Sequence, residues 1–139
     1  VRVAMLSHSN HGSSRSDSAL RMVAATAAAR EKVSLDECVI DGEIQLDVAL
    51  DPEVGPRKLP AISRSERADV LVFPSLDAAH ISSKILRHLG GAECYGKLIR
   101  GLTRPAAQVP RTATEDMILG TAAALGVEAI QYRLLHPKG

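Results

Sequence analysis

The chain has 139 residues, of which 45% are hydrophobic and only 2% aromatic, which is enough for one domain with an aliphatic core. Its formal net charge is +1, and neither a basic block nor a row of aromatic residues occurs, so nucleic acid and membranes are not expected partners. The sequence contains no signal peptide or membrane-spanning run, and its two cysteines, Cys38 and Cys94, lack a metal-ligand spacing. We therefore expect a cytoplasmic protein without a metal.

The first half of the chain alternates apolar runs, which predict strands, with periodic segments, which predict helices. Val1–Leu6 predicts a buried strand, and Asp17–Lys32 predicts a helix. The apolar stripe of that helix consists of Leu20, Val23, Ala24, Ala27 and Ala28, and helices so rich in Ala pack closely against a sheet. The other elements predicted here are a strand over Cys38–Ile40 that ends at Asp41-Gly42, a helix over Glu43–Leu50, and a surface loop over Gly55–Arg67.

The second half continues the alternation. Ala68–Phe73 is a continuous apolar run, typical of a strand covered on both faces. The other predicted elements are a helix over Leu76–Leu89 with Ile81, Ile85, Leu86 and Leu89 facing inward, strands over Gly96–Leu102 and Ala106–Val109, a helix capped by Thr112 or Thr114 that runs to about Tyr132, and a tail over Arg133–Gly139. This order predicts an α/β fold with a mostly parallel sheet and helices on both faces.

The segment Met5–Asp17 (MLSHSNHGSSRSD) leads from the first predicted strand into the first helix through small polar residues. Backbone N–H groups at a helix start bind anions, and Ser9, Gly12 and Ser13 are small enough to let a ligand approach. Ser14 is placed to cap the helix, with Asp17 three residues later. An ordinary turn that binds nothing is the alternative, because the segment has neither a Walker A nor a GxGxxG spacing.

Three further polar groups follow predicted strands or precede a helix, where ligands bind in such sheets. The segment Asp41–Asp47 holds three acidic residues, which also fit a turn, a charge at a helix start and a solvated Asp. Asp77 and His80 resemble an incomplete metal pair, for which no second ligand cluster exists. Arg111, just before the last helix, suits a phosphate or carboxylate, or lies exposed without a role.

Taken together and in order, these groups resemble the C-terminal part of the phosphate acetyl/butyryltransferase family. The resemblance rests on the segments MLSHSNHGSS, IDGEIQLDVALDPEV, ADVLVFPSLDAAHISSKILRHLGGAE and GLTRPAAQVPR, and it runs from Val1 to about Gln131. It implies the fold of the isocitrate and isopropylmalate dehydrogenases. Family members are longer, and this chain, which begins inside an apolar run rather than with Met, reads as an excised fragment. Residues 1–95 would form one lobe, and 96–139 would return toward the missing N-terminal lobe.

Two features resemble one branch of the family, the domain fused behind bacterial NADP-dependent malic enzymes. One is the segment Ser9–Ser14, which reads SNHGSS where the transacetylases tend to have Ser-Thr-Lys-Gly-Ser. The other is ALDPE at Ala49–Glu53. The resemblance to this branch implies a domain that senses acetyl-CoA and sets oligomerisation.

The resemblance also assigns roles to individual residues. Arg111 matches the arginine that binds the phosphate, and the anion site would be completed by Ser9, Asn10, Gly12 and Ser13. An arginine of the coenzyme A site falls at His88, next to Arg87. Pro110 replaces a serine of the transacetylases, and Met117 replaces the aspartate proposed as general base. Pro110 has no donor and Met117 cannot accept a proton, so the anion-binding residues are kept and the proton-handling residues are not.

These assignments lead to three functional hypotheses. The first is a regulatory domain of an NADP-dependent malic enzyme, which binds acetyl-CoA or acetyl phosphate with weak or lost transfer activity. The second is an active phosphate acetyltransferase or butyryltransferase that uses another base, such as Glu115 or Asp116. The third is a structural dimerisation module with an interface on the helix face Ile81–Leu89. Each allows a homo-oligomer. The first two imply coenzyme A or acetyl-CoA as an exchangeable ligand and no tightly bound cofactor, whereas in the third the ligand site is a relic.

Overall fold

The computed structural model describes residues 1–33, 38–59 and 66–135. The chain forms two compact units, Val1–Ser83 and Lys84–Gly139, whose border lies inside helix α4 (Leu76–His88). The predicted division near residue 95 refers to lobes of a longer protein and stays a prediction.

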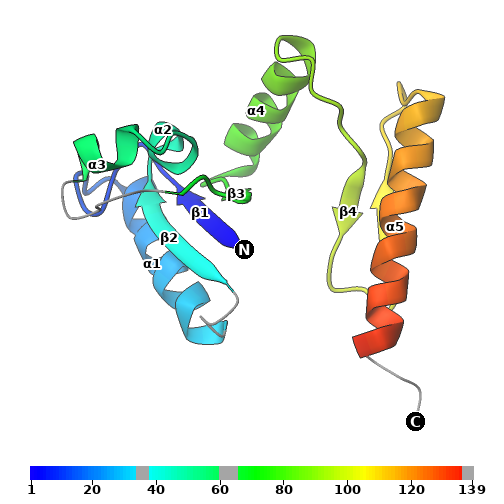
Figure 1. Cartoon of the computed structure of the whole chain (residues 1–139), viewed down its shortest axis with the longest axis horizontal. Helices are drawn as coiled ribbons and strands as arrows, with labels where there is room; N and C mark the ends of the chain where they lie inside the picture. The colour runs from blue at the N-terminus through cyan, green and yellow to red at the C-terminus, as the bar shows by residue number, and fades with distance from the viewer. Residues whose placement is uncertain (34–37, 60–65, 136–139) are drawn as a thin grey trace. The chain divides into compact units, whose positions relative to one another are not determined.

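The first unit is built on three parallel strands: β1 (Arg2–Leu6), β2 (Val39–Ile44) and β3 (Val70–Val72) (Figure 1). Their order is β2-β1-β3, so β1 is central, and Ala4 of β1 pairs with Asp41 on one side and Leu71 on the other. Strands that run in parallel need crossover helices, and the connections supply them. The predicted α/β fold with a mostly parallel sheet is confirmed.

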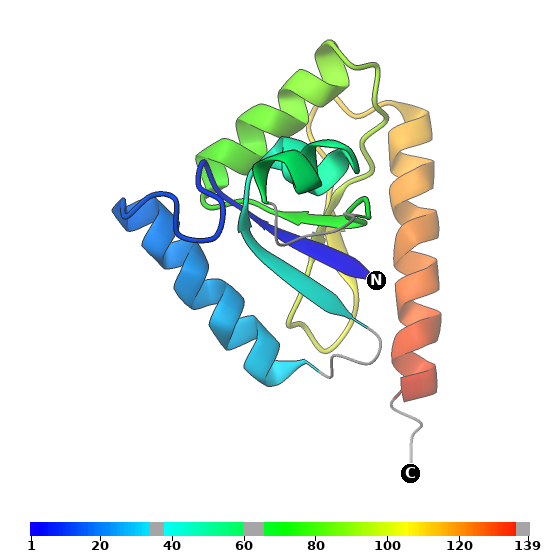
Figure 2. The same cartoon turned by 60° about the vertical axis from the view of Figure 1, so that its left-hand side comes forward.

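Helices cover both faces of this sheet (Figure 2). On one face, Met22 of α1 (Asp17–Lys32) packs with Met5 and Ile40. On the other face, Ala4, Leu6 and Ile44 pack with two residues of α2 (Leu46–Leu50), Val48 and Ala49. Burying each large apolar side chain in these clusters stabilises the unit by about 1.5–3 kcal/mol.

The face of α1 that contacts the sheet differs from the predicted stripe. Its buried residues are Ala19, Met22 and Thr26, whereas Leu20 and Val23 are 51% and 41% exposed and Ala24, Ala27 and Ala28 are also exposed. Small or apolar residues occur around most of this helix, so periodicity alone allowed more than one inward face. Thr26 satisfies its hydroxyl by donating to the Met22 carbonyl at 2.7 Å, which lets a polar residue face the sheet.

Strand β2 is longer than predicted and contains Asp41 and Gly42, which we expected to end it. A Cβ atom at position 42 would lie 2.5 Å from the Cβ of Met5 and 2.9 Å from the Thr26 hydroxyl oxygen. Gly42 therefore allows β1 and α1 to approach, and it does not form a turn. The following helix begins at Leu46 instead of Glu43, and α3 (Val54–Lys58) occupies part of the predicted loop, whose residues 60–65 lie outside the described part of the chain.

The second unit contains the end of α4, the antiparallel pair β4 (Lys97–Ile99) and β5 (Ala106–Gln108), and the long helix α5 (Glu115–Leu135). The hydroxyl of Thr114 accepts the Met117 N–H at 3.3 Å, so Thr114 is the residue that caps α5. The helix continues past Tyr132, so the predicted tail is wrong for residues 133–135, and residues 136–139 lie outside the described part.

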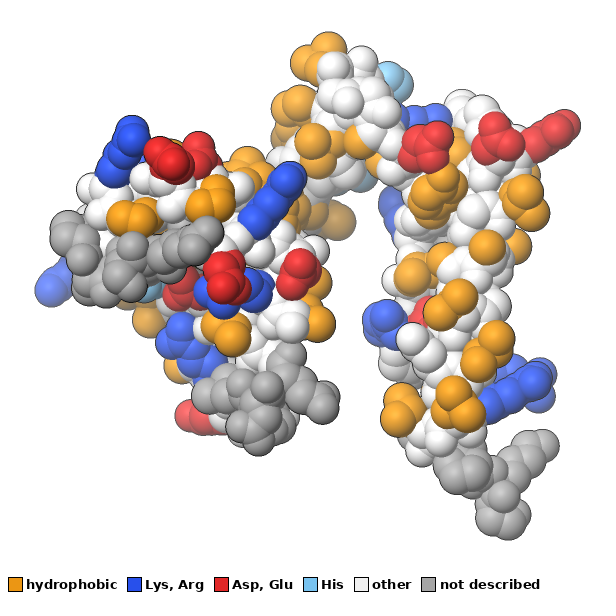
Figure 3. Space-filling model, in the orientation of Figure 1, with side chains coloured by type: hydrophobic (Ala, Val, Ile, Leu, Met, Phe, Trp, Pro, Cys, Tyr) orange, Lys and Arg blue, Asp and Glu red, His pale blue; other side chains and the backbone are white. Residues whose placement is uncertain are grey.

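Many apolar side chains of α4 and α5 are exposed. No residue of α4 is buried, so the prediction that Ile81, Ile85, Leu86 and Leu89 face inward is wrong for this chain. In α5 only Met117 and Thr121 are buried, and Figure 3 shows hydrophobic side chains along its length. A sequence period identifies an apolar helix face but does not show what covers it. None of the helices in the described segments is long and apolar enough to cross a membrane.

Candidate functional site

The loop between β1 and α1 is folded around one carboxylate. The Glu43 Oε1 atom accepts a 2.7 Å hydrogen bond from the Ser9 hydroxyl and another of 2.7 Å from the Gly12 N–H. The Ser9 oxygen in turn accepts the Ser14 N–H at 2.9 Å. Ser9 and Glu43 are only 0% and 2% exposed, so this contact lies inside the protein. The carboxylate of Glu43 thus accepts hydrogen bonds from Ser9 and Gly12, two residues that the sequence predicted to bind an anionic ligand.

Burial disfavours the charged form of Glu43, but the Gly12 N–H and the Ser9 hydroxyl donate to it, and together with nearby His11 they lower the pKa of this carboxyl. Glu43 is therefore ionised inside the loop at neutral pH. The interpretation of position 43 as a charge at a helix start is wrong, because Glu43 belongs to β2. An extended reading of the segment from Val39 to Ile44 could have placed Glu43 in this strand, but the shift in register with β1 between Met5 and Leu6 could not be read from the sequence.

A second layer of hydrogen bonds ties the loop to the residue after β2. The Asn10 amide nitrogen donates to Gln45 Oε1 at 2.9 Å, the Gln45 N–H donates to Asn10 Oδ1 at 2.7 Å, and Gln45 Nε2 donates to the His8 carbonyl at 2.8 Å. Asn10 is therefore used internally, as Ser9 is. Of the predicted anion ligands in this loop, Gly12 and Ser13 lie exposed. Anion binding by the four residues stays a prediction.

The N-terminus of α1 is capped by Ser16, whose hydroxyl accepts the Ala19 N–H at 3.3 Å. The prediction that Ser14 caps this helix is wrong by two residues, because its N–H is bound to Ser9 and its hydroxyl lies 3.1 Å from the His8 ring. The serines of this loop therefore form hydrogen bonds within the protein, to one another and to Glu43 and His8.

His11 extends from the same loop with a φ angle of 41°, in the left-handed region. Its Nε2 atom lies 3.1 Å from Asp41 Oδ1, which also accepts the Gly42 N–H at 2.8 Å and lies 3.7 Å from the Arg30 guanidinium. Asp41 therefore orients an imidazole at the carboxyl end of β1, a pairing that the sequence analysis did not single out.

In the second unit the structure brings Arg87 and Met117 together. The guanidinium of half-buried Arg87 lies 3.3 Å from the Met117 sulfur, and Met117 is 9% exposed. His88 is exposed, as are Asp77 and His80 in the first turns of α4. Arg111 and Pro110 are exposed in the turn before α5, which is closed by a 3.0 Å bond from the Ala113 N–H to the Pro110 carbonyl. The side chain of Arg111 is therefore available to an anionic ligand.

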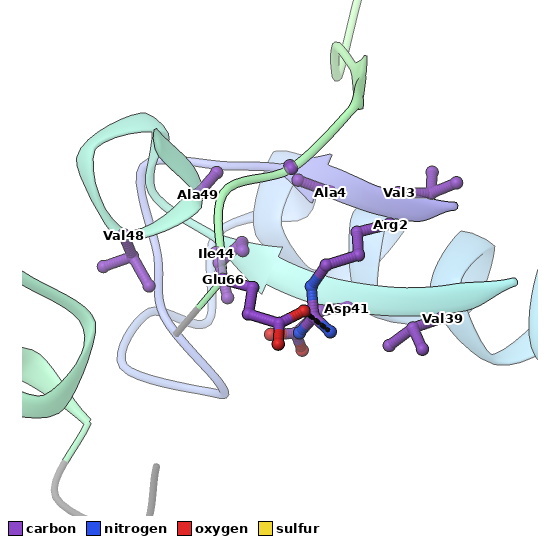
Figure 4. A pocket seen from close by; sticks show the side chains of 10 residues that line it. Arg2, Val3, Ala4, Val39, Asp41, Ile44, Val48, Ala49 and Glu66 are labelled. Atoms are coloured by element: carbon purple, nitrogen blue, oxygen red, sulfur yellow. Dashed lines mark hydrogen bonds and ion pairs between the residues drawn. The ribbon is translucent and has the colours of Figure 1, made fainter. Parts of the chain in front are cut away.

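A pocket beside the sheet of the first unit is unsuited to a large ligand (Figure 4). Its volume of about 40 Å³ holds a few water molecules at most. Arg2 reaches across it to Glu66 in an ion pair of 3.0 Å, which neutralises both charges. A second, open groove lies within the other unit, lined by Thr103, Arg104, Pro105, Leu125, Gly126, Ala129, Tyr132 and Arg133. Two of these residues, Arg104 and Arg133, carry positive charge, and no sequence motif had indicated this groove.

Residues 1–125 match the family model described as phosphate acetyl/butaryl transferase. The chain belongs to this family. A phosphate acetyltransferase of Acetivibrio thermocellus is 41% identical over 131 residues, which is 94% of this chain and 39% of that protein. A phosphate acetyltransferase of Staphylococcus epidermidis is 37% identical, covering 94% of this chain and 40% of its own length. The chain thus spans about two fifths of the length of these relatives.

Two solved structures share the fold. The EutD phosphotransacetylase from Staphylococcus aureus superimposes with a TM-score of 0.80 at 34% identity, over 94% of this chain and 39% of its own. A phosphotransacetylase from Streptococcus pyogenes gives a TM-score of 0.78 at 31% identity, over 93% of this chain and 39% of its own. The resemblance drawn from the four sequence segments is confirmed at the level of the family.

Proposed function

We propose that this chain is part of a phosphate acyltransferase that moves an acyl group between the thiol of coenzyme A and phosphate. The observation that carries the proposal is the exposed Arg111 in the turn that leads into α5, in a chain 41% identical to a phosphate acetyltransferase. This function was the second hypothesis from the sequence, and the named relatives favour it over a purely regulatory domain.

The proposed ligands are acetyl phosphate, coenzyme A and acetyl-CoA. Arg111 presents a planar fork of donors, which suits two phosphate oxygens. Gly12 and Ser13 lie exposed at the loop surface, where their backbone N–H groups are bonded to Glu43 and Asn10, and Arg87 and His88 would contact coenzyme A. In the reaction the thiol loses its proton, the sulfur attacks the acyl carbon, the carbon–oxygen bond to phosphate breaks, and inorganic phosphate leaves with the electron pair.

A second candidate is the regulatory domain of an NADP-dependent malic enzyme, which binds these ligands without efficient transfer. Buried Met117 favours it, because the resemblance places the general-base aspartate of the family at this position. If the missing carboxylate limits transfer, Met117→Asp should raise the rate in the complete protein and Met117→Leu should not. Both candidates include a cytoplasmic location. Both also include a homo-oligomer that forms through the exposed helix faces.

The test is thioester formation from acetyl phosphate and coenzyme A by the complete protein that contains this chain. Turnover of about 1 per second or more supports the acyltransferase. Arg111→Ala should then raise KM for acetyl phosphate by about tenfold or more, the effect of losing a charged hydrogen bond. Arg21→Ala, at an exposed position of α1, is the matched control.

A folded protein without turnover would contradict the acyltransferase. Tight binding of acetyl-CoA in that case, abolished by Arg111→Ala, would establish the regulatory candidate, and the absence of all binding would leave only a structural role.

A further inference from the structure

We propose that Met117 is a positioning residue for Arg87, which it holds without neutralising it, so that the guanidinium binds a phosphate group of coenzyme A. This inference rests on the proposed function, which supplies coenzyme A as the ligand. The observation behind it is the contact of 3.3 Å between an Arg87 guanidinium nitrogen and the Met117 sulfur, both within the second unit.

The two side chains extend from helix ends whose backbones are held by hydrogen bonds. At the end of α4, the Ala92 N–H donates to the Leu86 carbonyl at 3.1 Å, which closes the turn after Arg87. At the start of α5, the Met117 carbonyl accepts the hydroxyl of buried Thr121 at 2.6 Å, and Met117 itself is 9% exposed. The guanidinium therefore lies against a buried sulfur atom on a fixed helical turn.

The charge of Arg87 has no counter-ion among the described residues. Its guanidinium donates to the thioether sulfur, which is uncharged and a weak acceptor. None of the ion pairs in the described segments includes Arg87, whereas Arg100 in the same unit is paired with Glu128. Arg87 therefore keeps its charge, and most of its N–H donors, for a ligand.

The partial burial of Arg87 strengthens its attraction for an anion. Arg87 is half-buried, and opposite charges attract more strongly where less water lies between and around them. The planar fork of a guanidinium matches two oxygens of one phosphate group, and coenzyme A carries several such groups. A carboxylate at position 117 would pair with Arg87 and compete with the ligand, which the sulfur of Met117 does not.

The test is titration calorimetry of coenzyme A into the complete protein and its Met117 variants. Met117→Asp places a carboxylate against Arg87, so we expect the Kd of coenzyme A to rise by about tenfold or more. Met117→Leu removes the acceptor and keeps the charge, so Kd should rise by about threefold, the effect of losing a weak hydrogen bond. Met117→Gln offers a neutral amide oxygen and should bind as wild type does. Gln131→Glu adds the same charge at an exposed position of α5 and, as the matched control, should leave Kd unchanged.

An Arg87→Ala background separates this role from a general effect on the fold. If Met117 acts through Arg87, Met117→Asp should not raise Kd further in that background. A rise of the same size there would overturn the inference, as would an unchanged Kd when Met117→Asp is the only substitution. Should Met117→Asp fail to fold, equal Kd values for Met117→Leu and Met117→Gln would overturn it.

Inorganic phosphate, titrated in the same way, identifies the source of the phosphate group that Arg87 binds. Its Kd should not change in Met117→Asp, and a loss confined to inorganic phosphate would overturn the inference.

Thioester formation, measured separately, distinguishes the inference from the proposed function. Wild-type turnover with a coenzyme A affinity that ignores the Met117 series would leave the proposed function standing and overturn the inference. Coenzyme A binding that follows the series in a protein without turnover would refute the acyltransferase and support the inference. A wild-type protein that binds no coenzyme A would overturn both.

Discussion

The buried carboxylate of Glu43 and the buried hydroxyl of Ser9 form a hydrogen bond of 2.7 Å that holds the loop after β1. The same carboxylate oxygen accepts the Gly12 N–H, so one atom of β2 orders both halves of the loop. Because a buried donor without an acceptor is costly, the conformation of the loop depends on this one side chain.

Replacing Glu43 with Ala should therefore destabilise the protein. The Ser9 hydroxyl and the Gly12 N–H would lose their acceptor inside the protein, at a cost of about 1–3 kcal/mol each. Glu43→Gln keeps a carbonyl oxygen in place and should cost less. Urea unfolding measures both, with Glu31→Ala on the exposed side of α1 as the control. Equal stability of the Ala and Gln variants would show that the loop does not need the acceptor.

The depressed pKa of Glu43 predicts a loss of stability in acid. In the unfolded chain this carboxyl takes up a proton near its ordinary pKa of 4.5, whereas in the folded protein it stays charged to lower pH. Its contribution to stability is thus fully present above about pH 4.5 and is lost as pH falls through the folded value. Urea midpoints measured from about pH 7 to about pH 3 should fall more steeply for wild type than for Glu43→Gln. If the urea midpoints of the two proteins fell in parallel with pH, the assignment of this loss of stability to Glu43 would be wrong.

Gly96 makes a close contact in the second unit that only glycine allows. Its φ angle is 41°, and an added Cβ atom would lie 2.6 Å from Thr121 Cγ2. Gly96→Ala should destabilise the protein by about 1–3 kcal/mol through backbone strain and this clash. Gly101 has a φ angle of 85° with open space around it, so Gly101→Ala isolates the strain. We expect the smaller loss of the thermal midpoint in Gly101→Ala, and equal losses would mean that the Thr121 contact is unimportant.

Arg87 should contribute to coenzyme A binding from the last turn of α4. Arg87→Ala is expected to raise KM for coenzyme A by about tenfold or more, since a charged contact to phosphate is lost, and to leave KM for acetyl phosphate unchanged. Steady-state kinetics of the complete protein measure both constants. Lys84→Ala, one turn earlier at an exposed position, controls for the loss of positive charge on this helix. Equal effects on both substrates would argue for a general structural role.

Local sequence patterns predicted the positions of the helices better than they predicted which residues those helices contact. The boundaries of α1 and the start of α4 follow from periodicity, which acts within a few positions of the chain. The inward faces of both helices were predicted incorrectly, because Leu20 and Ile81, which belong to the predicted apolar stripes, are exposed. The sequence also gave no sign that Gly42 continues a strand, since the requirement for it comes from the Cβ of Met5, 37 positions earlier in the chain.

The alternation of elements, the small-residue loop and the position of Arg111 before the last helix were readable from the sequence alone, because each depends on neighbouring residues. Only the tertiary structure showed that Glu43 fills the loop, that Asp41 orients His11 and that Arg87 lies against Met117. These pairs are separated by about 30 positions in the chain, as His11 and Asp41 are, and the pairing of β1 with β2 or the packing around α5 brings them together. A sequence pattern formed by neighbouring residues carries no information about contacts between residues so far apart in the chain. The register of β1 with β2 determines the contacts of His11 and Glu43, and helix packing determines that of Arg87.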